Sequence, residues 1–228
     1  TLSGWAEKRI NFEIMNIADG VIVFTEFEKS FLINNGMPAN KIAVCGAGVD
    51  IDSFEHNDDE AFRKRHSLKD EPVIAFVGRI HKPKGISTLI QSMDAVWRLF
   101  PSARLVIAGL TVKASQEIKE GVDSLEQKDK VIWIDNFSEE EKAQVFSGCD
   151  VFALPSRVES FGIVYLEAWM CNKPVIGCLG TAAEAVIDHG KDGFLVEYGN
   201  AGQLSKAIIT LLQDKEMRDS FGSRGREK

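Results

Sequence analysis

The hydrophobic pattern of the chain becomes regular from residue 72 onward. Short continuous apolar runs, most of them bounded by Pro or Gly, are typical of strands that are buried on both faces of a parallel sheet. Such runs cover residues 73–77, 105–108, 131–134, 151–154, 175–176 and 194–196. Apolar residues at helical spacing lie between most of these runs. They predict helices over residues 86–100, 116–128, 162–171, 182–187 and 204–212, and Ser138 and Glu141 predict a capping box at the start of one more.

This alternation of strand and helix predicts an α/β fold. Because strand–helix–strand crossovers are right-handed, the expected product is a Rossmann-like parallel sheet with helices on both faces. Ligands bind such sheets outside the carboxyl ends of the strands. The loops that follow the strands are therefore the segments in which to look for chemistry.

The first 54 residues have a different organisation. Two predicted strands at residues 21–24 and 42–44 surround a predicted helix at 26–35, and an acidic, polar stretch follows at 56–60. These elements are too few for an independent core. We therefore expect residues 1–54 to be the tail of a preceding domain plus a linker, residues 55–228 to be one domain, and the chain to be a fragment.

Composition and charge exclude some classes of function. The chain has 228 residues, of which 44% are hydrophobic, so a sizeable core is available. Its net charge of -7 argues against bulk nucleic-acid binding, which needs a basic footprint. The chain has no apolar run of the roughly 18 residues that span a bilayer.

The four cysteines are scattered, and no CxxC pair occurs. Single cysteines in apolar contexts are typical of buried thiols in a reducing compartment, which predicts a cytoplasmic protein. The sequence Asp50-Ile51-Asp52 is a literal D-x-D motif, but it lies in the predicted linker. Short motifs match by chance, so we expect no metal site there.

The first candidate binding segment follows the strand at 73–77. Gly78 and Gly85 bound a loop that carries three cations, and glycine lets a backbone approach a ligand closely. Arg79 can grip phosphate oxygens with two parallel hydrogen bonds, and Lys84 can add a point charge. The alternative is an ordinary solvated basic loop.

The second candidate segment lies between the strand at 151–154 and the next helix. Ser160, Phe161 and Gly162 are expected at a helix N-terminus, where free N–H groups and the helix dipole bind phosphate. Glu159 beside a phosphate would be repulsive, so its better use is to accept hydrogen bonds from sugar hydroxyls. Glu167 lies in an apolar stretch and needs a partner such as ribose hydroxyls, unless it simply faces water.

These segments together resemble glycosyltransferase family four, the large retaining family with the GT-B fold, whose C-terminal half matches nearly the whole chain. The segments that carry the resemblance are Ala18-Asp19 with Val21-Ile22-Val23-Phe24, Gly48-Val49-Asp50 with Phe54, Val77-Gly78-Arg79-Ile80 through Lys84-Gly85, Pro155-Ser156, Glu159-x7-Glu167, Pro174-Val175-Ile176, Glu184, and Gly193-Phe194-Leu195-Val196. Each motif is loose, but their order and spacing are specific. One departure is Ala47, where the family usually carries Asn.

The resemblance implies a role for each residue. Three residues are expected to take part in catalysis, with Arg79 and Lys84 stabilising the leaving diphosphate of a nucleotide-sugar donor and Glu159 binding its sugar. The ribose is assigned to Glu167. The remaining substrate contacts that the resemblance implies are Gly78 in the phosphate-contacting loop, Asp135 and Asn136 near the base, and Ser160, Phe161, Gly162 and Ile163 near the phosphates.

The resemblance also implies what the chain works with. The family needs neither a metal nor another cofactor, and the acceptor, which is a glycan, a lipid or a small molecule, is bound by the missing N-terminal domain. The fragment is thus expected to bind donor without turning it over. Two alternatives remain, a GT-B nucleotide-sugar epimerase or hydrolase and a non-enzymatic nucleotide-sugar-binding module. The family also leads us to expect that residues 206–224 continue into a helix that returns to the N-terminal domain.

Overall fold

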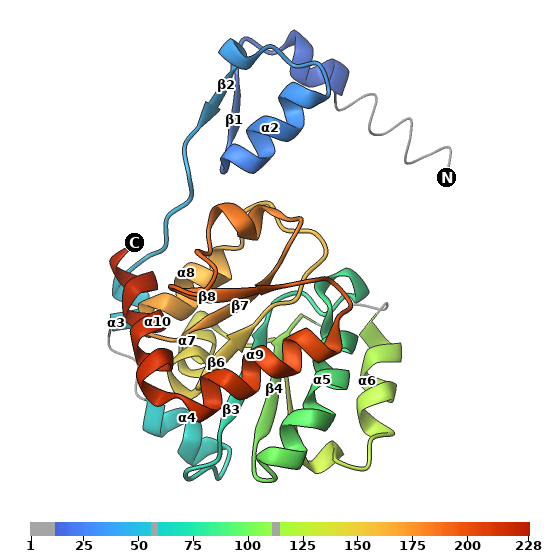
Figure 1. Cartoon of the computed structure of the whole chain (residues 1–228), viewed down its shortest axis with the longest axis vertical. Helices are drawn as coiled ribbons and strands as arrows, with labels where there is room; N and C mark the ends of the chain where they lie inside the picture. Colours follow the sequence, from blue (N-terminus) through green and yellow to red (C-terminus); the bar gives the residue numbers. More distant parts are fainter. Residues whose placement is uncertain (1–11, 56–58, 111–114) are drawn as a thin grey trace. The chain divides into compact units, whose positions relative to one another are not determined.

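The computed structural model describes residues 12–55, 59–110 and 115–228 (Figure 1). The chain forms two compact units, Thr1–Ala47 and Gly48–Lys228. The larger unit begins earlier than the domain boundary expected after Phe54, because Val49 and Phe54 already pack against its core. Part of the predicted acidic linker, residues 56–58, lies outside the described residues.

The smaller unit contains a parallel pair of strands, β1 (Val21–Val23) and β2 (Ile42–Val44), and helix α2 (Glu26–Asn34). The hydroxyl of Thr25 accepts a hydrogen bond from the Glu28 N–H at 3.1 Å, which caps α2 at its start. A small apolar cluster joins the three elements: Val23, Leu32, Met37 and Ile42.

The larger unit is built on a six-stranded parallel sheet in the order β5-β4-β3-β6-β7-β8. Its strands are β3 (Val73–Val77), β4 (Arg104–Gly109), β5 (Val131–Asp135), β6 (Val151–Ala153), β7 (Val175–Cys178) and β8 (Gly193–Val196). All six fall on the predicted apolar runs. The strand order is that of a doubly wound dinucleotide-binding fold, so the predicted Rossmann-like fold is confirmed.

Helices cover both faces of this sheet (Figure 1). Helices α5 (Ile86–Leu99) and α9 (Ala201–Gln213) pack together on one face, and α7 (Glu139–Gly148) and α8 (Ile163–Met170) pack together on the other. The capping box predicted for α7 is present, with the Glu141 N–H donating to the Ser138 hydroxyl and the Ser138 N–H donating to the Glu141 carboxylate. The remaining helices are α3 (Asp52–Glu55), α4 (Asp59–Arg65), α6 (Gln116–Asp123) and α10 (Lys215–Glu227).

Two predicted helices are shorter in the structure. Helix α6 ends at Asp123 instead of residue 128, and the Ser124 hydroxyl donates to the Gly121 carbonyl at 2.8 Å, a side-chain contact that competes with helix continuation. Residues 182–187 form only one 3-10 turn, Ala182–Ala185, which Thr181 caps by accepting from the Ala183 N–H.

The segment at 206–224 does not continue as one helix. It breaks at Asp214, whose extended backbone ends α9 and whose carboxylate accepts the Met217 N–H at 2.8 Å to start α10. Helix α10 packs against α8 and β8, and Phe221 lies edge-on to Phe194 at 5.2 Å between ring centres. Helix α10 therefore packs within the larger unit, which counts against the expectation that this segment returns to the N-terminal domain.

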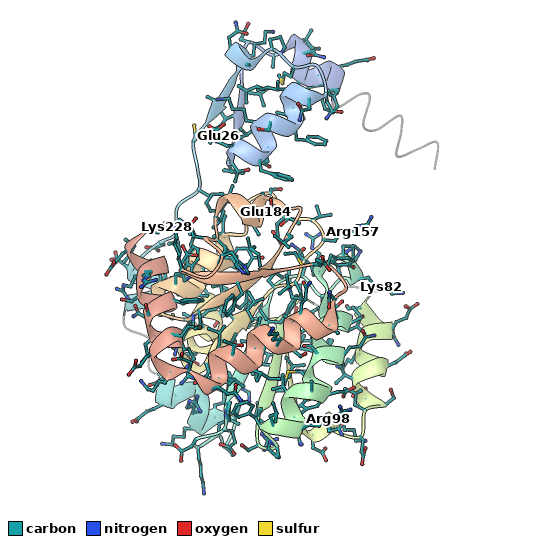
Figure 2. All side chains as sticks on the ribbon, in the orientation of Figure 1. Glu26, Lys82, Arg98, Arg157, Glu184 and Lys228 are labelled. Carbon is teal, nitrogen blue, oxygen red and sulfur yellow. The ribbon has the colours of Figure 1, made fainter. Side chains whose placement is uncertain are left out.

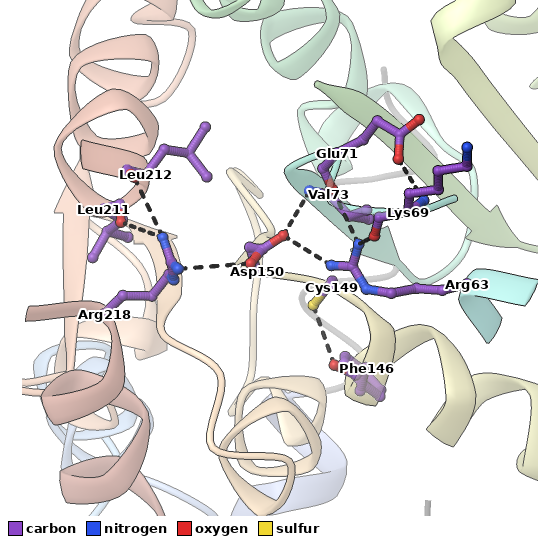
Figure 3. A network of polar contacts seen from close by, with 10 residues as sticks. All are labelled: Arg63, Lys69, Glu71, Val73, Phe146, Cys149, Asp150, Leu211, Leu212 and Arg218. Carbon is purple, nitrogen blue, oxygen red and sulfur yellow. Dashed lines mark hydrogen bonds and ion pairs between the residues drawn. The ribbon is translucent and has the colours of Figure 1, made fainter. Parts of the chain in front are cut away.

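The amino-terminal edge of the sheet is held by Asp150, which lies just before β6 (Figure 3). One carboxylate oxygen accepts from the Val73 N–H at 2.8 Å and from Arg63 at 3.2 Å, and the other lies 3.8 Å from the Arg218 guanidinium. This side chain therefore connects β3, β6, α4 and α10.

Candidate functional site

The candidate site lies at the point where the strand order of the sheet reverses, between β3 and β6. From β3 the chain adds β4 and β5 on one side, and it then returns to add β6 on the other side of β3. Adjacent parallel strands that lead away in opposite directions leave a crevice at their carboxyl ends. The two predicted binding segments, residues 78–85 and 155–162, follow β3 and β6 and so meet at this crevice.

Close backbone packing joins the two segments. Gly85 has a φ of 76°, and a Cβ built there would lie 2.0 Å from the Pro155 carbonyl oxygen, so only glycine allows this approach. The Arg157 N–H donates to the Pro83 carbonyl at 2.7 Å. Figure 2 shows Arg157 near Lys82 at this end of the larger unit, with Arg98 at the opposite end. The two loops thus form one continuous surface.

Lys84 and Glu159 form an ion pair between these loops. The Lys84 Nζ and a Glu159 carboxylate oxygen lie 2.5 Å apart, and the side chains are 28% and 9% exposed. Sequence reasoning assigned Lys84 to phosphate and Glu159 to sugar without connecting the two. The Lys84 ammonium therefore compensates the charge of the Glu159 carboxylate.

Arg79 is exposed at the start of the first loop, just after β3. Within the described part of the chain, its guanidinium has no hydrogen bond or ion pair. The neighbouring Gly78 carbonyl lies so close to Gly109 that a Cβ on Gly109 would be 2.0 Å from it, which fixes the direction in which the loop leaves β3. Arg79 is therefore a cation on a fixed backbone and is free to bind an anion.

The start of helix α8 lies at the end of the second loop. Gly162 is its N-cap with a φ of 86°, and a Cβ there would lie 2.4 Å from the Tyr165 ring. A glycine N-cap brings no side chain to the free N–H groups of the first turn, which leaves them for a ligand. Ser160 and Ile163 are exposed beside it, whereas Phe161 packs partly against the core.

Tyr165 stabilises the first turn of α8 from the core side. Its ring is fully buried, and its hydroxyl donates to the Leu154 carbonyl at 3.0 Å. Burial, with the nearby Glu159 carboxylate, raises the pKa of Tyr165 well above its usual value. The hydroxyl is therefore a structural donor.

Glu167 is buried on α8, as predicted, but its partner is a protein side chain. Lys142 on α7 donates to one Glu167 carboxylate oxygen at 2.7 Å. The other oxygen, Oε2, is buried and has no hydrogen-bond partner among the described residues. The alternative of an exposed Glu167 is therefore wrong.

Lys142 was missed by sequence reasoning. It lies four residues before the buried Phe146 and so on the apolar side of α7. A lysine on the apolar side of a predicted helix is the sequence feature that could have revealed it. Its partner is 25 residues away along the chain, which no local pattern reveals.

Asp135 and Asn136 lie at the end of β5, the edge strand of the sheet. Asn136 adopts a left-handed backbone with a φ of 52°, and the Asp135 carboxylate lies 3.7 Å from the Lys119 ammonium. Strand β4 separates them from the two loops. They lie at the same carboxyl edge as the rest of the site, but at the end of the sheet where β5 is the outer strand.

The first aspartate of the D-x-D motif has a local side-chain partner. The Asp50 carboxylate accepts a hydrogen bond from the Ser53 hydroxyl at 2.8 Å, at the start of α3. In the described residues, no group of three or more His, Cys, Asp or Glu side chains could hold a metal ion. No described helix is long and apolar enough to cross a membrane.

Comparison with known proteins decides the family. Residues 57–228 match the family model for the glycosyl transferases group 1. The chain belongs to this family. It is 30% identical over 225 residues to the capsular polysaccharide biosynthesis glycosyltransferase CapM of Staphylococcus aureus, and 33% identical over 211 residues to a D-inositol 3-phosphate glycosyltransferase of Mycobacteroides abscessus.

These matches cover most of this chain but only part of each relative. The alignments include 94% and 89% of the chain, and 57% and 46% of the two relatives. The chain thus spans about half the length of the curated relatives that it matches.

Solved structures of other proteins share the fold. Sucrose-phosphate synthase from Thermosynechococcus elongatus superposes with a TM-score of 0.87 at 27% identity, over 96% of this chain and 55% of that one. HepE of Anabaena, solved with UDP and glucose, gives a TM-score of 0.87 at 24% identity, over 96% and 60%. The group 1 chain is accordingly the C-terminal domain of a GT-B glycosyltransferase, as the motifs predicted.

Proposed function

We propose that this chain is the donor-binding half of a retaining glycosyltransferase that moves a hexose from a nucleotide diphosphate sugar to an acceptor. The observation that carries the proposal is the set of groups that meet at the carboxyl edge of the sheet, beside its switch point. It combines an arginine that has no partner among the described residues, an N-terminus of α8 without a side-chain cap, and a lysine–glutamate pair that offers both a cation and a hydroxyl acceptor. The complex of HepE with UDP and glucose supports the same ligand class.

In this proposal each group has one task. Arg79, Lys84 and the N–H groups at Phe161 to Ile163 bind the diphosphate and stabilise the charge that develops on it as it leaves. Glu159 accepts hydrogen bonds from the sugar hydroxyls, and Glu167 accepts from the ribose. Because these cations and N–H donors hold the diphosphate directly, the proposed reaction needs no metal, and chelation with EDTA should leave affinity unchanged.

The acceptor belongs to the part of the relatives that this chain does not span. We therefore assign acceptor binding to a preceding domain, and donor binding without turnover to the chain itself. The four cysteines are free thiols, which fits a reducing compartment such as the cytoplasm.

Isothermal titration of the chain with UDP-glucose, GDP-mannose and ADP-glucose tests the proposal. Lys84→Ala should weaken binding of the preferred donor by roughly 1.5–3 kcal/mol, because it removes a charged hydrogen bond and leaves Glu159 buried beside the phosphates. Lys82→Ala is the matched control. Lys82 lies on the same loop, but its side chain is 65% exposed and pairs with Glu117, so its loss should change affinity little.

A folded chain that binds none of the three donors would contradict the proposed function. Equal losses in the Lys84 and Lys82 variants would instead show that the loop attracts anions only through its general charge. Circular dichroism on each variant confirms that the fold is intact before binding is compared.

A further inference from the structure

The buried pair of Lys142 and Glu167 has a feature that the proposed function does not use. Lys142 contacts two carboxylates, lying 2.5 Å from the exposed Glu139 and 2.7 Å from the buried Glu167. The side chains of Lys142 and Glu167 are only 14% and 9% exposed. A charge-assisted contact of this kind fixes the rotamer of the glutamate.

Stability alone does not account for this arrangement. Removing two charges from water costs free energy that their attraction often fails to recover, and an apolar pair would fill the same space. The Glu167 Oε2 atom adds a further cost because it is buried and has no partner in the part of the chain that the structure describes. Buried polar atoms are nearly always paired in native proteins, so an unpaired one points to a ligand that completes it.

The position of the pair indicates which part of a ligand would bond to the unpaired Oε2 atom. Helix α7 begins directly after the segment at Asp135 and Asn136, and α8 begins at the segment that ends with Gly162. Lys142 and Glu167 both lie within about two turns of these helix starts. A nucleotide whose base lies at the first segment and whose phosphates lie at the second would place its ribose between the two helices.

Lys142 is charged at this position. Burial opposes its charge, but the hydrogen bonds that Lys142 donates to Glu139 and Glu167 outweigh burial and raise the pKa of Lys142 above its usual value. The Phe54 ring lies 6.0 Å from the ammonium and adds a favourable face. Lys142 therefore stays protonated and keeps Oε1 of Glu167 occupied, which leaves Oε2 as the free acceptor.

We propose that Lys142 is a positioning residue that makes this site selective for ribonucleotides, by holding Oε1 of Glu167 so that Oε2 accepts from the ribose hydroxyls. This inference rests on the proposed function, because it assumes a nucleoside diphosphate in the crevice. Lys142 does not touch the ligand, and its effect passes through Glu167.

Titration with matched pairs of nucleotides tests the inference. The probes are UDP, GDP and ADP and their 2′-deoxy counterparts, measured on the full chain and on Lys142→Met. The wild-type chain should prefer the ribonucleotide of its best pair by at least about tenfold, the value of one charged hydrogen bond. In Lys142→Met this preference should fall to within about threefold of unity, mostly through weaker binding of the ribonucleotide.

Glu139→Gln is the matched control. It removes the other carboxylate that contacts Lys142, but Glu139 is 82% exposed, so the preference should stay at the wild-type value. Should Lys142→Met fail to fold, Lys142→Gln replaces it, since it keeps a polar side chain of similar length without the charge.

The outcomes separate the two proposals. A folded Lys142 variant that binds the ribonucleotide with an unchanged preference overturns the role of Lys142 alone. A wild-type chain that binds neither member of any pair overturns the proposed function, and this inference with it. A merely structural Lys142 would weaken both members of a pair equally and leave their ratio unchanged.

Discussion

The two edges of the same sheet use charged residues in opposite ways. At the amino edge, Asp150 and the two arginines beside it are bonded to protein groups (Figure 3). At the carboxyl edge, Arg79 has no partner among the described residues and one oxygen of Glu167 is unpaired. Both edges are rich in charge, so charge alone does not mark a binding site.

The difference lies in how much hydrogen-bonding capacity the protein leaves unused. Around Asp150, Arg63 donates to the carbonyls of Lys69 and Glu71, and Arg218 donates to the carbonyl of Leu211. These contacts connect helices to strands and stabilise the fold. At the carboxyl edge the unused donors and acceptors lie on rigid backbone, which suits them to a ligand. The following changes test this contrast.

The largest effect is expected at the amino edge, from Asp150→Ala. It leaves Arg63 and Arg218 partly buried without their shared carboxylate and removes the acceptor of the Val73 N–H. The free energy of unfolding should fall by about 2–3 kcal/mol, measured by urea denaturation. Nucleotide affinity of the remaining folded protein should stay unchanged.

The control is Asp219→Ala, which removes an exposed carboxylate paired with Lys215 on the surface of α10. Exposed pairs of this kind contribute little, so stability should change by less than about 0.5 kcal/mol. An Asp150 variant as stable as this control would mean that the amino-edge network is not what holds the sheet to its helices.

The intermediate effect is expected from Arg79→Ala, and it should appear in binding only. Because Arg79 is exposed and bonds to none of the residues that the structure describes, the free energy of unfolding should change by less than about 0.5 kcal/mol. Affinity for a nucleoside diphosphate should fall by about 1.5–2 kcal/mol, since a charged hydrogen-bond donor is lost. Arg98→Ala, an exposed arginine at the other end of the larger unit (Figure 2), should change neither quantity.

The smallest effect concerns a residue near the carboxyl edge that is fully bonded. Ser138→Ala removes the cap of α7 and should lower the free energy of unfolding by about 1 kcal/mol. Ser124→Ala, which removes a contact outside any capping box, serves as the comparison. If unused bonding capacity decides function, Ser138→Ala should leave nucleotide affinity within about twofold, measured by titration. A loss of nucleotide affinity as large as that of Arg79→Ala would show that a residue's position at the edge, and not its unused bonding capacity, determines its effect on binding.

The sequence predicted most of the fold because its signals were local. Each strand of the large sheet is a short apolar run, and the capping box of α7 lies within four residues. Helix α4 was not predicted, because Phe62 is its only buried side chain and so gives no periodic pattern. That ring packs against Gly148, far along the chain, and this contact supplies the burial that local sequence could not reveal.

The candidate site was predicted as a set of residues but not as a set of pairs. Family motifs pointed to Glu159 and Glu167, and the structure places both at the carboxyl edge. Their lysine partners were not connected to them, because Lys84 precedes Glu159 by 75 residues and Lys142 precedes Glu167 by 25. Only the crossovers of the sheet bring such residues together.

The contact of Gly85 with the Pro155 carbonyl has a consequence for how this site can change over generations. The two loops are far apart in the gene, yet no side chain fits between them. An insertion or a bulkier residue in either loop would displace the other, so the two loops are expected to vary together or not at all. Adaptation to a new donor therefore has more freedom at the far side of the crevice, near Asn136, than at the junction itself.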